Sequence, residues 1–177
     1  TTGTYPARQA DADALHVTLG TEHIAGSPFD VAITAGATCA PQVSVTGKGT
    51  VTAVAGADTP LRIAALDCYS NLKAKGGDAF TVTLTKPGMP NIFGRVLDRA
   101  DGTYDGSYNV SARGQWTLHV KTGGVHVRGS PFAITVQPAT VSPAASIAVG
   151  AGTEKAYTGE TTVFMVRTKD AWGNDLG

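Results

Sequence analysis

The chain repeats itself at an offset of 103 residues. The tetrapeptide Gly-Ser-Pro-Phe stands at residues 26–29 and returns at 129–132. The same register continues without a gap and matches Leu15 with Leu118, His16 with His119, His23 with His126, Asp67 with Asp170, and Asn71 with Asn174. A period near 100 residues is too long for a solenoid unit and has the size of one independent domain. The chain is therefore expected to be a string of similar domains.

Two proline-containing linkers, at residues 35–41 and 137–143, divide this string. Exposed segments rich in Pro and small residues are typical of domain boundaries. We therefore predict that residues 1–36 are the C-terminal part of one repeat, that 37–138 form a complete repeat, and that 139–177 are the N-terminal part of the next.

The composition favours strands and turns over long helices, with 22 Gly, 9 Pro and abundant Thr and Val. Within the complete repeat, alternation of apolar and polar residues predicts seven short strands, at 42–46, 61–66, 79–85, 93–98, 103–110, 115–122 and 131–136. The residues expected to face inward are Trp116, Leu118 and Val120 in one strand and Phe132, Ile134 and Val136 in another. Seven such strands with regular turn signals predict an all-β fold, a seven-stranded antiparallel β-sandwich.

Several short motifs carry a resemblance to a known family. They are Gly-Gly-Asp at 76–78, Asp-Gly-Thr-Tyr at 101–104, Gly-Gly at 123–124, Gly-Ser-Pro-Phe, and two copies of an Asp-x-x-Gly-Asn turn at 67–71 and 170–174. The second turn matches fully, whereas the first has Ser70 in place of Gly. In order and spacing these motifs resemble the filamin (actin-binding protein 280) repeat. The resemblance implies tandem immunoglobulin-like sandwiches.

The residues contain no convincing catalytic, cofactor-binding or metal-binding pattern. Gly47-Lys48-Gly49-Thr50 lacks the spacing of a phosphate-binding loop, and its counterpart at 150–153 keeps the glycines without the lysine, so a bend in the first strand is expected. His119 and His126 should share an outward face across the 123–124 turn, but two imidazoles fall short of the four ligands of a zinc site. No enzyme activity and no cofactor or metal are expected.

Charge and hydropathy exclude two further classes of partner. Lys and Arg total 14 and Asp and Glu total 14, so the chain has no basic field for nucleic acid or an anionic membrane. The apolar runs are far shorter than the roughly 18 residues of a membrane span. Partners are therefore expected to be proteins.

The resemblance places a partner site along the edge of the third strand, at Ala79, Thr81, Thr83 and Thr85. A peptide would add there as an extra strand, with affinity from backbone hydrogen bonds. The alternatives are an ordinary edge strand protected by Lys86 and Pro87, or a groove covered by residues 144–149 of the next repeat.

Two functions follow from the resemblance. The first is a structural and protein–protein interaction module in a larger cytoplasmic, cytoskeleton-associated scaffold. The alternative is an ectodomain segment of a cell-surface adhesion protein, such as a gamete adhesion protein, because filamin-type repeats also occur in surface proteins. Each hypothesis implies a different redox environment.

The two cysteines and one asparagine bear on this choice. Cys39 precedes the first strand and Cys68 follows the second, so both should lie at one pole of the sandwich, where a disulfide could join them. Asn109-Val110-Ser111 is a glycosylation acceptor. Free thiols are expected of a cytoplasmic scaffold, and a bridge with a glycan on Asn109 is expected of the extracellular alternative.

Overall fold

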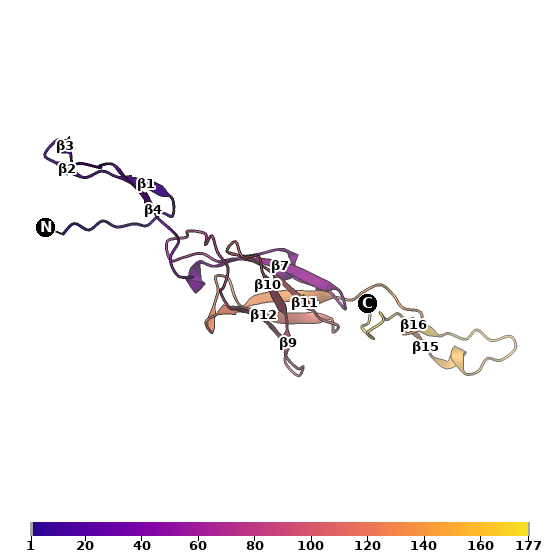
Figure 1. The fold of residues 1–177 in the computed structure, drawn as a ribbon. Helices are drawn as coiled ribbons and strands as arrows, with labels where there is room; N and C mark the ends of the chain where they lie inside the picture. The colour runs from indigo at the N-terminus through magenta and orange to yellow at the C-terminus, as the bar shows by residue number, and fades with distance from the viewer. Residues whose placement is uncertain (1, 177) are drawn as a thin grey trace.

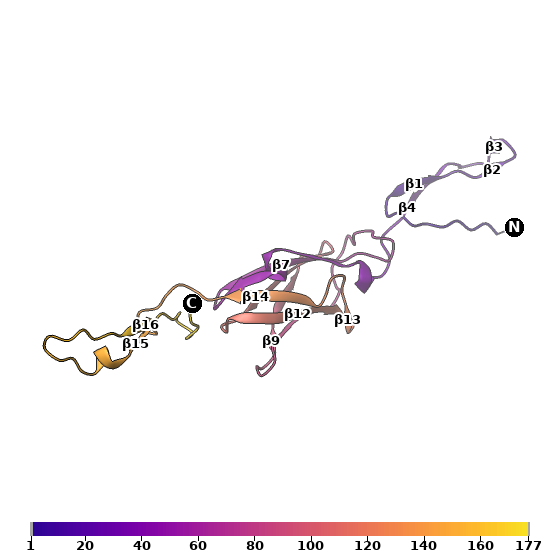
Figure 2. The ribbon, with the colours of Figure 1, turned by 180° about the vertical axis from the view of Figure 1, so that it is seen from behind.

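The computed structural model describes residues 2–176, and three parts of the chain follow one another in an extended arrangement (Figure 1). In the N-terminal segment (residues 2–36) the strands are β1 (Ala12–Leu15), β2 (Thr18–Leu19), β3 (Glu22–His23) and β4 (Phe29–Ala32), paired as β1–β4 and β2–β3. In the C-terminal segment (residues 139–176) β15 (Ile147–Val149) pairs with β16 (Met165–Arg167), and η3 (Ala151–Thr153) lies between them. The central sandwich lies between these two segments (Figure 2).

The central sandwich consists of two sheets and two short 3-10 turns, η1 (Ala40–Gln42) and η2 (Lys48–Thr50). The first sheet has the order β10 (Arg95–Asp98), β11 (Thr103–Asn109), β7 (Asp58–Ala64), β5 (Ser44–Thr46). The second has the order β6 (Thr52–Val54), β14 (Phe132–Gln137), β12 (Gly114–Thr122), β8 (Phe80–Thr85), β9 (Ile92–Phe93), and β13 (Val125–His126) pairs with the end of β12. All pairs are antiparallel except β6 with β14, which are parallel. The predicted all-β sandwich is confirmed.

The core lies between the two sheets and contains the inward residues that the alternation predicted. Trp116, Leu118 and Val120 of β12 are buried, as are Ile134 and Val136 of β14, whereas Phe132 at the end of β14 is half-buried. The facing sheet contributes Leu61, Ile63, Tyr104 and Tyr108. Burial raises the pKa of Tyr108 to about 12, so its hydroxyl stays neutral and donates a hydrogen bond to the Gly49 carbonyl at 2.7 Å. Among the described residues, no helix has the length and apolar character needed to cross a membrane.

Two strands pass from one sheet to the other. The first strand bends at Gly47, whose φ of 112° favours glycine, and η2 then carries the chain from β5 in one sheet to β6 in the other. The predicted single strand at 93–98 is instead divided at Gly94: β9 pairs with β8, and β10 pairs with β11. A Cβ at Gly94 would lie 2.7 Å from the Ser107 carbonyl oxygen, so a larger residue would not allow this crossing.

Leu118→Ala should lower the free energy of unfolding of a protein consisting of residues 37–138 by about 2–5 kcal/mol, because Leu118 is fully buried and its truncation leaves a cavity. Urea unfolding followed by circular dichroism measures this. Thr81→Ala, at an exposed position of β8, is the control and should change stability by less than about 0.5 kcal/mol. A non-cooperative transition of the unmodified protein would contradict the predicted boundaries of the complete repeat.

Candidate interaction sites

The outer edge of β8 is partly occupied by the chain itself. On this side β9 pairs with Thr83 and Leu84, and the Gly94 N–H donates to the Val82 carbonyl oxygen at 2.8 Å. On this side residues 79–81 at the start of the edge, and Thr85 at the end of β8, have no strand partner among the described residues. Within the described residues, residues 144–149 form no strand pair with this edge, and β15 pairs with β16 in a separate sheet.

The four candidate contact residues of this edge, Ala79, Thr81, Thr83 and Thr85, alternate with the buried residues of β8 and face outward. Ala79 and Thr81 are exposed, whereas Thr83 and Thr85 are half-buried. Phe93 of β9 lies opposite Thr83 and is 76% exposed, which the sequence analysis did not single out. An exposed aromatic ring beside an open strand end is suited to a side chain of an added peptide strand.

The histidine pair lies on the outer face next to this edge. The rings of His119 and His126 are 5.4 Å apart, and each is held by a hydroxyl, His119 by Thr85 at 3.0 Å and His126 by Ser130 at 2.8 Å. Burial, followed by the positive charges of His126 and Lys121, lowers the pKa of His119 below its usual value. Among residues 2–176, no group of three or more His, Cys, Asp or Glu side chains is placed to hold a metal ion.

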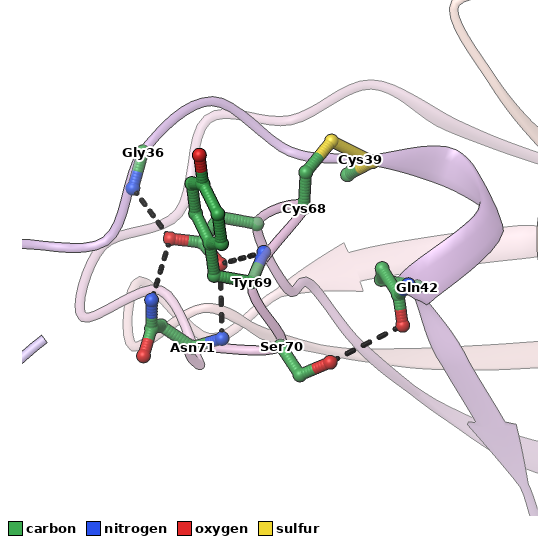
Figure 3. Close-up of a disulfide and its surroundings, with 8 residues drawn as sticks. Gly36, Cys39, Gln42, Cys68, Tyr69, Ser70 and Asn71 are labelled. Carbon is green, nitrogen blue, oxygen red and sulfur yellow. Dashed lines mark hydrogen bonds between the residues drawn. A yellow bond between two sulfur atoms is a disulfide. The ribbon is translucent and has the colours of Figure 1, made fainter. Parts of the chain in front are cut away.

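A disulfide marks one pole of the central sandwich (Figure 3). It joins Cys39, which precedes η1, to Cys68, which follows β7, with 5.0 Å between their Cα atoms. The two cysteines therefore lie together at the pole where the sequence analysis expected them. Asn109, the glycosylation candidate, lies at the opposite end of β11, where it is exposed and donates from Nδ2 to the Gly56 carbonyl at 2.8 Å.

Next to the disulfide, the Asp67 carboxylate organises a turn. Its oxygens accept hydrogen bonds from the backbone N–H groups of Gly36, Tyr69 and Asn71 and from the Asn71 side chain, at 2.8–3.0 Å. Figure 3 shows Gly36 and Asn71 directed toward this carboxylate from two different parts of the chain. The Asn71 side-chain bond and then the Gly36 bond lower the pKa of Asp67 to about 2, although burial opposes this. Asp67 is therefore ionised at neutral pH.

The fold and the repeated motifs define an immunoglobulin-like β-sandwich repeat. The family model described as the Filamin/ABP280 repeat matches residues 37–133, more than half of the chain, and the chain belongs to this family. The expected resemblance is therefore confirmed.

Relatives and solved structures agree with this assignment. Tripartite motif-containing protein 2 of Homo sapiens is 30% identical over 142 residues, which cover 78% of this chain and 19% of the relative, so the chain spans about a fifth of that protein. The Lin-41 filamin domain covers 58% of this chain with 98% of its own, at 20% identity and a TM-score of 0.51. The Escherichia coli adhesin FdeC covers 88% of this chain and 49% of its own, at 22% identity and a TM-score of 0.61. These two structures are similar in fold.

Asp67 should make stability depend on pH in the acid range. Its pKa is about 2 in the folded chain against roughly 3.9 unfolded, so its contribution is complete above about pH 4 and is lost as the pH falls toward 2. Urea unfolding of the chain and of Asp67→Asn at several pH values between 2 and 7 measures the difference. The unmodified chain should have the higher free energy of unfolding at neutral pH, and its excess over Asp67→Asn should shrink as the pH falls. An excess that is constant with pH would count against the ionised carboxylate.

Proposed function

We propose that this chain is a non-catalytic spacer and protein-binding segment of filamin-type repeats in a larger, cytoplasmic and cytoskeleton-associated scaffold. In this proposal residues 37–138 are one complete repeat, and 1–36 and 139–177 belong to its two neighbours. Membership of the filamin repeat family supports the interaction role, and the open end of β8 beside Phe93 is the observation that carries it. The partner would be an extended peptide segment of another protein.

The partner would bind by adding a strand to the second sheet. Its backbone would pair with the outward-directed groups of Phe80, between Ala79 and Thr81, and its side chains would alternate between the surface of Phe93 and solvent. Further pairing along Thr83 and Thr85 would require the peptide to displace β9, which holds β8 by the two pairs at Thr83 and Leu84 and by the Gly94 bond. Because β9 is two residues long, little pairing opposes this displacement.

Thr81→Glu should weaken a bound peptide about tenfold, because a charge beside the added strand must lose water when the strand pairs. A displayed library of short random peptides is selected against the chain, and the affinity of the strongest binder is measured by titration calorimetry. Thr83→Glu should weaken it further if the peptide displaces β9.

Thr46→Glu, at an exposed position of β5 in the other sheet, is the matched control and should leave the affinity unchanged. If Thr81→Glu and Thr83→Glu also leave it unchanged, the peptide binds elsewhere and the β8 edge is not the partner site.

A second candidate is an ectodomain segment of a cell-surface adhesion protein. The Cys39–Cys68 disulfide supports it, because disulfides persist in oxidising compartments and are rare in the cytosol. The exposed Asn109, in a glycosylation triplet, is consistent with secretion. FdeC, which has a similar fold, is an adhesin, so sandwiches of this kind also occur in adhesion proteins.

Intact mass of native protein distinguishes the two compartments. After alkylation without reduction, a cytoplasmic chain should gain two alkyl groups and carry no glycan. An extracellular chain should gain none until it is reduced and should lose mass at Asn109 on deglycosylation. The second result would replace the scaffold by the adhesion function.

A further inference from the structure

The turn at 67–71 has a structural copy at 170–174. In the second turn Asp170 accepts hydrogen bonds from the N–H groups of Trp172 and Asn174 and from the Asn174 side chain, at 2.8–3.0 Å. These bonds match those that Asp67 receives from Tyr69 and Asn71. Each turn is therefore closed by its own aspartate.

Each asparagine also reaches outside its own turn. Asn71 donates from Nδ2 to the Arg8 carbonyl at 2.8 Å and accepts at Oδ1 from the Ala10 N–H at 3.0 Å. Asn174 does the same with Ser111 at 2.7 Å and Arg113 at 2.9 Å. Ser111 and Arg113 lie 103 residues after Arg8 and Ala10, so the two contacts are the same contact made twice.

Each aspartate also binds the linker that leads into its own unit. Asp67 Oδ2 accepts from the Gly36 N–H, and Asp170 Oδ2 accepts from the Ala139 N–H, both at 3.0 Å. Gly36 and Ala139 again lie 103 residues apart. The second turn thus binds the linker at Ala139 and the loop in front of β12. The first turn binds the linker at Gly36 and the equivalent loop of the N-terminal segment.

The aromatic residue of the turn makes a third contact across the second junction. A Cβ at Gly56 would lie 1.9 Å from the Trp172 ring, so this ring packs directly on the bare Gly56 backbone of the central sandwich. Tyr69 holds the equivalent place in the first turn, with the Arg8 guanidinium 6.0 Å from its ring centre. The residue equivalent to Gly56 in the C-terminal segment is Gly159, and the space around it is open.

These contacts exceed what a simple turn needs. Of the three hydrogen bonds made by the Asn71 side chain, one closes its own turn and two hold the N-terminal segment. Beside them Ile33 and Leu72 line a hollow of about 620 Å³, so apolar side chains do not fill this part of the junction. At the first junction the polar bonds of Asn71 therefore contribute directly to the angle between the two parts.

We infer that the Asp-x-aromatic-x-Asn turn is a docking element, and that its partner is the opposite pole of a preceding repeat of the same kind. The turn sets one orientation between successive repeats, so that tandem copies form a rod of regular twist. This deepens the spacer role proposed above. The docking role does not depend on peptide binding at β8, so the docking proposal and the peptide-binding proposal can fail separately.

The second junction offers the cleaner test, because Ser142 and Ala171 stand where the first junction has its disulfide. Residual dipolar couplings of the whole chain report how the central sandwich and the C-terminal segment are aligned. The unmodified chain should fit one alignment tensor for both parts. Asn174→Ala should require two tensors and should raise hydrogen exchange of the Arg113 amide about tenfold.

A second variant tests the junction from the other partner and leaves the turn intact. Gly56→Asn keeps a residue that tolerates positive φ but removes the space for Trp172, so it should also separate the two tensors. Gly88→Asn, at φ +77° with open space around it, and Asn91→Ala, an exposed position, are the matched controls and should keep one tensor. One shared tensor in both junction variants, or two tensors in the unmodified chain, would overturn the docking role.

Discussion

Burial of the inward face of β12 is the constraint on which the rest of the structure depends. This strand pairs with β14 on one side and β8 on the other, so its register places the side chains of three strands in one layer. Trp116, Leu118 and Val120 are at most 3% exposed. At roughly 1.5–3 kcal/mol for each large apolar side chain, their burial strongly opposes any shift in register. A shift by one residue would turn all three toward solvent and expose the partners facing them.

The strand crossings at Gly47 and Gly94 complete the sandwich, because they let one continuous segment cover the edges of both sheets. After Gly47, β6 covers the edge of β14, and before Gly94, β9 covers part of the edge of β8. Covered edges resist pairing with other chains. The short length of β9 leaves one edge incompletely covered, and this is where the proposed partner strand would add. The crossing at Gly94 thus sets both how far this edge of the sandwich is protected and where it stays accessible.

The sequence was sufficient for the sandwich and its inward residues, since period-two alternation in β8, β12 and β14 reports directly which face is buried. The sequence did not allow prediction of β6 or of the division of the predicted strand at Gly94. A three-residue strand shows no clear period, and the Gly94-Arg95 interruption between two apolar pairs does not by itself distinguish a bend within one strand from a crossing between two sheets. The outward position of Phe93 follows only from that division, which explains why this candidate contact was not predicted.

The junction contacts lay further beyond prediction, because the groups that Asn71 and Asn174 bind are backbone atoms about 60 positions earlier in the chain. Backbone atoms leave no residue-type signal. The repeat offset nevertheless marked both asparagines, and their paired geometry explains why the same residue stands at both places. A polar docking turn has a further physical consequence. Apart from the single aromatic ring, its donors and acceptors can be satisfied by water when no neighbour is present, so the pole exposes less apolar surface than a fully apolar interface would. Repeats joined in this way can keep a defined angle without depending on one another for their cores.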